Sequence, residues 1–129
     1  MSATIEASAG AGTASLATSA AFERFAIVCA VTTPLLYVLI EMANWPLFTY
    51  HPATGRFDLG GAPPISGEGP AMYWYGWTAT MLIASGALGL LGAVLPQSAI
   101  RKIPLSLIWI MPLVAIPILV YALRSFWRW

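Results

Sequence analysis

Three long apolar segments without an internal Lys or Arg occupy most of this 129-residue chain. They run over Phe25–Leu47, Pro70–Leu95 and Ile103–Leu123. A transmembrane helix needs about 20 consecutive apolar residues, so each segment is long enough to cross a bilayer. The pattern predicts an all-α membrane protein with three transmembrane helices.

Only 9% of the residues are charged and 59% are hydrophobic, whereas a soluble domain carries about 25% charged residues. A soluble fold of this length would have to enclose more apolar surface than it can. We therefore expect one membrane domain over residues 22–129. A flexible tail is expected over residues 1–21, whose small side chains bury too little to offset the entropy of ordering. The formal net charge is +1 and there is no basic stripe, so nucleic acid is not an expected partner.

One sizeable loop, residues 49–69, separates the first two predicted spans. Its Gly-Gly and Pro-Pro pairs are expected to exclude regular structure, and Gly55 and Asp58 suit tight turns. Its apolar side chains predict a partly ordered extramembrane loop that lies on the membrane surface or against a partner. These side chains are Phe57, Leu59 and Ile65.

Three spans would place three basic residues on each side of the membrane, so the positive-inside rule alone does not decide the orientation. One side holds Arg24, Arg101 and Lys102, and the other holds Arg56, Arg124 and Arg128. The rule applies best to short loops, and Arg101 and Lys102 lie together in the short loop between the second and third spans. In the 49–69 loop, acidic residues offset the charge of the single Arg. We therefore expect a bacterial inner (plasma) membrane protein with a cytoplasmic N-terminus.

Glu41 is the only ionisable side chain within a predicted span. An intramembrane carboxylate is a functional candidate because charge is costly in a bilayer. Glu41 lies roughly 24 Å along the helix from Phe25, near the far boundary of the membrane. There it can be an interfacial anchor paired with an arginine such as Arg56, which is the favoured interpretation, or part of a proton or ion pathway.

His51 is the only histidine and follows the first span. A histidine can ligate a metal, a haem or a chlorophyll-type magnesium, which makes His51 the candidate cofactor-binding residue. A closed metal site needs several ligands, and no second histidine or cysteine pair accompanies it. An ordinary loop histidine bonded to backbone is therefore favoured. No nucleophile–base pair or phosphate-binding loop is present, so we predict no catalytic residue, no metal site and no cofactor.

Small residues recur at three- and four-residue steps along one side of the second predicted span. Such residues let helix backbones approach closely, and this drives helix association in lipid. The contact is expected within the chain, with another copy, or with a partner. The predicted helix-packing residues are Ser85, Gly86, Gly89, Gly92 and Ala93.

Aromatic side chains flank the 49–69 loop more densely than anchoring in a membrane requires. Together with two charged loop residues they form a predicted partner surface, or a contact for a ring-bearing lipid, quinone or pigment. This surface consists of Trp45, Phe48, Tyr50, Arg56, Asp58, Tyr73, Trp74 and Trp77.

Two resemblances concern only the outline of the chain. Its length and three-span plan are similar to those of the membrane-anchor subunits of succinate dehydrogenase and fumarate reductase. The haem-carrying members of that group place a histidine inside a span, and this chain has none there. Pro96 and Gln97 form a pair that resembles the Pro-Gln pair of the PQ-loop half-transporters, but it follows the second span instead of breaking the first. Neither resemblance assigns the chain to a family.

The favoured function is a small non-catalytic integral membrane subunit that packs within and stabilises a larger inner-membrane complex of respiratory, photosynthetic or oxygenase type. Membrane lipid and other integral membrane subunits are then the expected partners. The alternative is a homo-oligomeric transporter or ion-conducting module with Glu41 on the pathway, because three helices cannot enclose a pathway alone. Proline-bent spans would supply its flexible elements. A cofactor-binding subunit that uses His51 is the third hypothesis.

Overall fold

The computed structural model describes residues 19–124. The predicted tail over 1–21 therefore lies almost entirely outside the described residues, as does the chain after Arg124. The described part is mostly helical, as predicted, and it also contains a two-stranded sheet. In chain order the elements are α2 (Ala20–Ala43), β1 (Phe48–His51), β2 (Arg56–Leu59), α3 (Trp74–Val94), α4 (Gln97–Ile100) and α5 (Leu107–Ala122).

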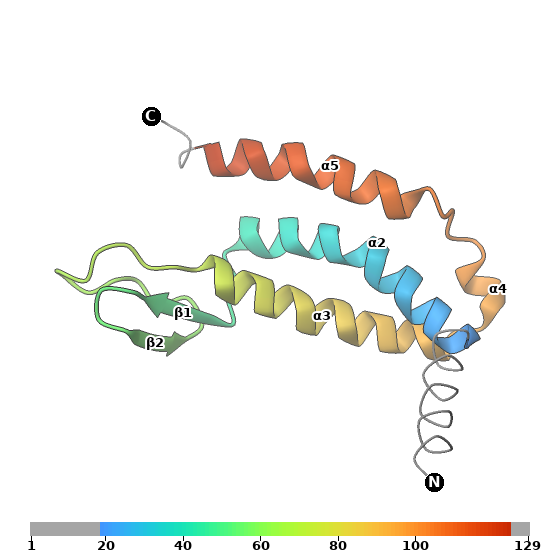
Figure 1. Cartoon of the computed structure of the whole chain (residues 1–129), viewed down its shortest axis with the longest axis horizontal. Coiled ribbons are helices and arrows are strands. Elements are labelled where there is room, and N and C mark those ends of the chain that lie inside the picture. Colours follow the sequence, from blue (N-terminus) through green and yellow to red (C-terminus); the bar gives the residue numbers. More distant parts are fainter. Residues whose placement is uncertain (1–18, 125–129) are drawn as a thin grey trace, which may run out of the picture.

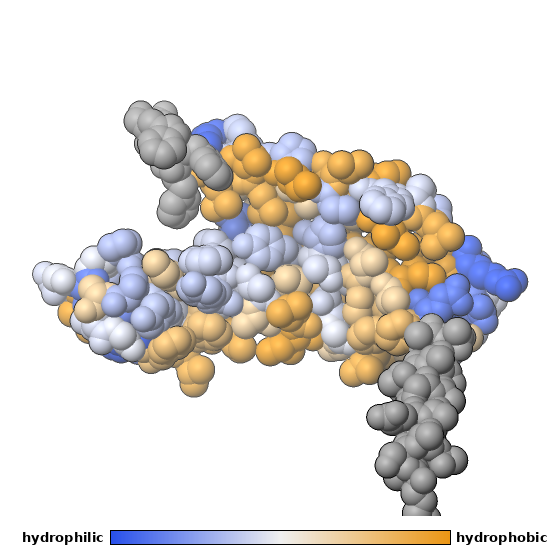
Figure 2. Space-filling model, viewed as in Figure 1, coloured by the Kyte–Doolittle hydropathy of each residue, from blue (hydrophilic) through white to orange (hydrophobic). Residues whose placement is uncertain are grey.

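The three long helices lie side by side in one row, with α2 between α3 and α5 (Figure 1). By length and composition, α2 and α3 can each cross a membrane. α5 is more apolar than either but has only 16 residues, roughly 24 Å of helix, so it is a shorter apolar helix. Large apolar side chains stay exposed along the row, where they give the orange surface of Figure 2.

The first helix begins and ends earlier than the predicted 25–47. The Ser19 hydroxyl accepts a hydrogen bond from the Phe22 N–H at 3.2 Å and so caps the helix at its start. At the other end Asn44 adopts the left-handed conformation with a φ of 50°, which terminates α2 after Ala43. Pro46 has no N–H to donate and follows two residues later, so residues 44–47 leave the helix instead of completing it.

The second and third helices are also shorter than predicted. Pro70 does not open α3, because Met72 forms an antiparallel bridge to Tyr50 of β1 and the helix begins only at Trp74. The third helix begins at Leu107 instead of 103, after the short α4 and a turn. The ends of these apolar segments, which composition alone assigns to helix, therefore form turns or pair with a strand instead.

α2 contains Pro34, and the helix changes direction part-way along its length (Figure 1). The hydroxyls of Thr32 and Thr33 donate to the carbonyls of Val28 and Cys29 at 2.8 Å and 2.7 Å. The carbonyl that Pro34 leaves without a donor is the one four residues before it, and neither hydroxyl binds that atom. These threonines therefore do not replace the missing hydrogen bond. They bind the two preceding carbonyls of the same turn.

Glycines bring the backbones of α2 and α3 close together. A Cβ on Gly89 would overlap Cys29 Sγ and lie 2.8 Å from the ring of Phe25, and one on Gly92 would lie 2.5 Å from Val28 Cγ2. Only residues without a side chain fit at these positions. Such close approach increases the van der Waals contact that holds helices together where water supplies no driving force.

Polar bonds join α2 to α3 at both ends of the pair. Arg24 donates from Nε and Nη2 to the Ala93 carbonyl near the end of α3, at 3.2 Å and 2.8 Å. At the opposite end the Trp77 indole donates to Asn44 Oδ1 at 3.2 Å. A cation near a helix C-terminus also interacts favourably with the helix dipole. These bonds set the register between the two helices.

The 49–69 loop contains regular structure, which corrects the all-α prediction. β1 and β2 form an antiparallel pair, and residues 52–55 connect them in a turn that includes Gly55 at a φ of +68°. Asp58 does not lie in a turn but within β2. The Gly-Gly and Pro-Pro pairs come after β2, so they end the sheet without preventing it.

Candidate functional site

The two faces of the hairpin formed by β1 and β2 differ sharply in chemistry. The register pairs Thr49 with Asp58 and His51 with Arg56 on one face. Since side chains alternate along a strand, the other face carries the pairs of Phe48 with Leu59 and Tyr50 with Phe57. One face is thus polar and ionic, and the other is aromatic and aliphatic.

His51 lies at the centre of the ionic face and is 0% exposed. Its Nε2 is 3.2 Å from Asp58 Oδ2, and its Nδ1 is 3.5 Å from Glu68 Oε2. Arg56 joins the same two carboxylates, with Nε 2.9 Å from Asp58 and Nη2 3.2 Å from Glu68. Among the described residues, these four side chains form one ionic cluster. The favoured loop histidine bonded to backbone is instead surrounded by charged side chains.

Glu68 comes from the segment that follows β2 and folds back over the ionic face. Its Oε2 accepts the Ile65 N–H at 2.9 Å, and its Oε1 accepts the Thr54 hydroxyl at 3.1 Å. The Ile65 bond is the main reason that the pKa of Glu68 lies below its ordinary value of 4.5. Burial opposes this shift, while Thr54 and the charges of Arg56 and His51 add to it.

Thr49 ties the returning segment to the same face. It is fully buried, its hydroxyl donates to the Gly60 carbonyl at 2.6 Å, and it accepts the Ala62 N–H at 3.2 Å. Tyr73 then donates to the Ala62 carbonyl at 3.2 Å, which links the segment to the start of α3. The ionic face is therefore closed by the chain itself.

The ionic cluster is held by ion pairs among its own side chains, while His51 Nδ1, Arg56 Nε and Asp58 Oδ2 have no aligned hydrogen-bond partner in the described residues. The Arg56 guanidinium already supplies the cation between the two carboxylates, and within residues 19–124 no three His, Cys, Asp or Glu side chains are placed to hold a metal ion. His51 has no exposed surface for a haem or pigment to reach. The predicted pairing of Arg56 with Glu41 does not occur, since Arg56 pairs with Asp58 and Glu68.

The apolar face of the hairpin is turned outward. Leu59 is 92% exposed and Phe57 is 65% exposed. The Phe57 ring packs at 5.5 Å from that of Phe48 and 4.7 Å from that of Tyr50. We call Phe48, Tyr50, Phe57 and Leu59 the outer patch. A hairpin whose ionic face is mostly covered and whose apolar face is more exposed reverses the arrangement expected of a surface hairpin in water.

The hairpin is held firmly against α3. The Leu47 N–H donates to the Gly76 carbonyl at 3.1 Å, and a Cβ on Gly76 would overlap the Phe48 carbonyl. Figure 1 shows both strands extending past the end of α3, in roughly the direction of that helix. The outer patch therefore projects from the end of the helical row.

A pocket of about 340 Å³ lies beside the hairpin end of α3. Three of its residues, Tyr73, Trp74 and Trp77, belong to the predicted partner surface, and Tyr37 of α2 and Leu123 complete the lining. The volume is near the lower limit of ordinary ligand pockets. These rings could hold a small ring or an acyl chain.

The remaining predicted residues have separate environments. Trp45 is largely exposed, and its carbonyl accepts the Thr80 hydroxyl at 3.0 Å. Glu41 has one buried oxygen, Oε2, with no hydrogen-bond partner in the described part of the chain. Ser85 is buried, whereas a Cβ on Gly86 would meet no atom within 4 Å. The predicted helix-packing residues thus occupy more than one side of α3.

Sequence reasoning missed the roles of Glu68, Thr49 and Thr54 in the ionic cluster and its closure. Alternation of small or charged with aromatic residues in 48–51 and 56–59 was a signal for a hairpin. A hairpin predicted from this alternation would have paired His51 with Arg56 across the two strands. Glu68 lies ten residues beyond Asp58 in irregular chain, and no local pattern brings it to His51.

No protein-family model, curated protein or solved structure matches this chain.

Proposed function

We propose that this chain is a small, non-catalytic subunit of a larger bacterial inner-membrane complex of respiratory, photosynthetic or oxygenase type. Three transmembrane helices anchor it, and the outer patch of the hairpin contacts a neighbouring subunit. The observation that carries the proposal is the inverted hairpin, whose His51 and Glu68 are buried and whose Phe57 and Leu59 face outward.

The lengths of the helices support a membrane location. α3 has 21 residues, roughly 32 Å of helix, which matches a hydrocarbon core of about 30 Å. α2 is slightly longer. α5 crosses as the third span together with its apolar flanks over 103–123, and a short span of this kind is accommodated by local thinning of the bilayer. The N-terminus and the Arg101-Lys102 turn lie on the cytoplasmic side, and the hairpin lies on the other.

The position of the hairpin favours a protein partner over lipid tails. A strand of four residues extends roughly 13 Å, whereas the headgroup layer on each side of the core is roughly 6 Å thick. Since β1 and β2 continue past the end of α3 (Figure 1), the hairpin reaches beyond the acyl chains. Leu59 pairs with Phe48, which packs against Gly76, so Leu59 lies level with the first turn of α3. Phe57 lies farther out and would be exposed to water unless another subunit covered it.

The experiment is extraction of native membranes in a gentle detergent, followed by a native gel that detects this chain. We expect the wild-type chain to migrate in a species much larger than itself. Leu59→Asp should shift most of the chain to the free fraction, because an unpaired carboxylate in an apolar contact costs several kcal/mol. Leu59 is 92% exposed, so the variant chain should melt like the wild type.

The matched control is Ile65→Asp. Ile65 is also an exposed apolar residue of the extramembrane segment, but it lies outside the two strands. Ile65→Asp should therefore leave the large species on the native gel intact. Migration of the wild-type chain alone, or an equal effect of the two variants, would contradict the proposal.

A second function, a homo-oligomeric transporter or ion-conducting module, is favoured by one observation. Glu41 Oε2 is buried without a hydrogen-bond partner in the described residues, and an intramembrane carboxylate of this kind often marks an ion pathway. In liposomes that contain the purified chain, Glu41→Gln should abolish the flux of protons or cations. Absence of flux in the wild type, or equal flux in the variant, would exclude this function.

A further inference from the structure

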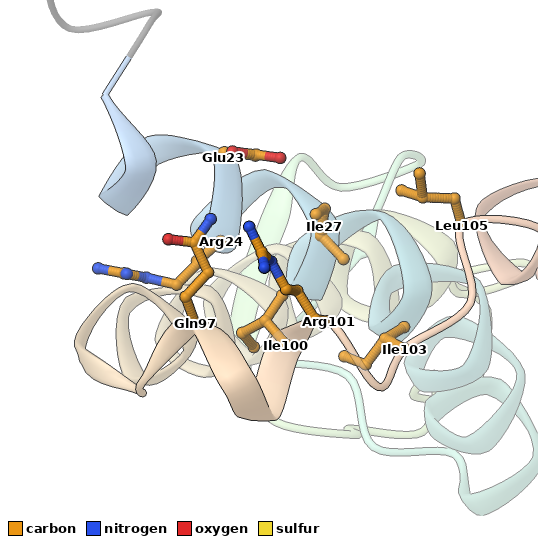
Figure 3. A pocket seen from close by; sticks show the side chains of 8 residues that line it. All are labelled: Glu23, Arg24, Ile27, Gln97, Ile100, Arg101, Ile103 and Leu105. Carbon is orange, nitrogen blue, oxygen red and sulfur yellow. The ribbon is translucent and has the colours of Figure 1, made fainter.

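A second pocket, of about 370 Å³, lies at the end of the helical row opposite the hairpin. It is formed by the first turns of α2, by α4 and by the connection to α5 (Figure 3). Its lining is divided by chemistry. Arg24, Gln97 and Arg101 supply polar groups, and isoleucine and leucine side chains supply an apolar wall.

The two arginines have donors to spare. Arg24 uses Nε and Nη2 for the Ala93 carbonyl, and a guanidinium has five N–H donors. That bond also fixes Arg24 in position. Arg101 is exposed and has no ion-pair partner among residues 19–124. In Figure 3 its side chain reaches from α4 towards the first turns of α2, whereas the Arg24 guanidinium points the other way and the Gln97 amide lies between the two.

The charge balance of the pocket is positive. Glu23 is the one acidic residue of the lining, and it forms no ion pair with Arg24 or Arg101 in the described structure. Lys102 adds a further positive charge next to the pocket without lining it. Guanidinium groups bind phosphate oxygens in paired hydrogen bonds, so an anionic phosphate is the ligand that this balance favours.

The apolar wall of the pocket indicates that the ligand also has an apolar part. Ile27 of α2 and Ile100 of α4 line the pocket with Leu105, and Ile100 is buried. A free inorganic anion would leave this surface uncovered, whereas the acyl chains of a phospholipid would cover it. Basic pockets at the cytoplasmic ends of membrane helices bind anionic headgroups for the same reasons.

We propose that this pocket binds a phosphate group at the Arg101 guanidinium beside the Gln97 amide, and that the phosphate belongs to an anionic phospholipid whose acyl chains lie against Ile27, Ile100 and Leu105. The inference uses the membrane location proposed above but not the larger complex. It adds a specific lipid site at the end of the chain opposite the outer patch.

The test uses the purified full chain in nanodiscs that contain phosphatidylglycerol and phosphatidylcholine with identical acyl chains. Native mass spectrometry then measures which lipid stays bound. The wild type should retain phosphatidylglycerol about tenfold over phosphatidylcholine, as expected for a charge-assisted pair of hydrogen bonds. Arg101→Gln should remove most of this preference. Lys102→Gln is the matched control, because it removes the neighbouring charge outside the pocket, and it should keep the preference.

A second arm adds inorganic phosphate at millimolar concentration to identify the source of the phosphate. Phosphatidylglycerol that stays bound identifies the lipid. Displacement of the lipid by phosphate in the wild type, absent in Arg101→Gln, identifies a site for free phosphate. Equal retention of the two lipids by the wild type, or equal loss in Arg101→Gln and Lys102→Gln, would overturn the inference. A chain that fails to insert into nanodiscs would overturn the membrane location as well.

Discussion

At the scale of single residues, the hairpin depends on an enclosed histidine. His51 and Thr49 are the largest fully buried side chains of the described part. Burying charged groups is favourable only when each has a partner, and here the carboxylates of Asp58 and Glu68 lie beside both His51 and Arg56. Truncation of one partner would leave the others enclosed without compensation, so this cluster determines the conformation of the whole segment.

Glu68 makes the stability of this segment depend on pH. Its pKa is lower in the folded chain than the ordinary 4.5, so the unfolded chain binds a proton at higher pH than the folded chain does. The stabilisation is therefore fully present above about pH 4.5 and is lost as the pH falls through the folded pKa. We expect the protection of the Ile65 amide from hydrogen exchange, corrected for intrinsic rates, to fall below about pH 4.5.

Glu68→Gln is the control for this titration. The glutamine can still accept the Ile65 N–H, but it has no proton to gain, so the part of the pH dependence that Glu68 causes should disappear. The same loss of protection in the variant would show that Glu68 does not cause it.

At the scale of elements, the contact of α2 with α3 depends on where each small residue faces. Gly89 and Gly92 lie against Phe25, Cys29 and Val28, whereas Gly86 faces open space. The three glycines differ little in sequence context, yet only two of them face α2.

The two environments predict opposite effects of one added methyl group. Gly89→Ala should destabilise the chain by about 1–3 kcal/mol, because the methyl group overlaps Cys29 and Phe25. Gly86→Ala should be neutral or stabilise by up to about 1 kcal/mol, because alanine favours the helix and nothing obstructs it. Unfolding of the purified chain by SDS titration measures both.

Cys29→Ala tests the cause of the Gly89→Ala effect. Removal of the thiol makes room for the methyl group, so the double variant should recover part of the lost stability. Equal destabilisation by the two glycine substitutions would show that the close approach at Gly89 is not the cause. Loss of the large native species in Gly86→Ala, with an unchanged melt, would instead place a partner on that side of α3.

At the scale of the whole molecule, a single row of three helices leaves both of its broad sides open. Within residues 19–124, α2 is the only long helix with a neighbour on each side (Figure 1), and even so few of its residues are buried. A row of this kind cannot enclose a pathway. Lipid, a second copy or another subunit must cover the two broad sides, and this agrees with the proposed role as a subunit.

Much of this arrangement could be predicted, but with systematic errors at the ends of elements. Apolar composition located α2, α3 and α5, because a long apolar run without charges favours helix in lipid. It could not show that Asn44 would end α2 or that Met72 would pair with Tyr50. The end of α2 follows from a local signal that composition does not show, Asn44 with Pro46 two residues later. The pairing of Met72 depends on Tyr50, which lies outside the segment.

The sequence alone determined the mostly helical fold and the presence of helices able to cross a membrane, since both follow from local composition and length. Only the tertiary structure decided that Glu68 and Arg56 enclose His51, that Leu59 faces outward, and that Gly89 and not Gly86 lies against α2. The physical reason is the distance along the sequence over which each kind of interaction acts. Apolar segments form helices through interactions within a few residues, whereas ion pairs, exposure and close approach join positions that only the folded chain brings together.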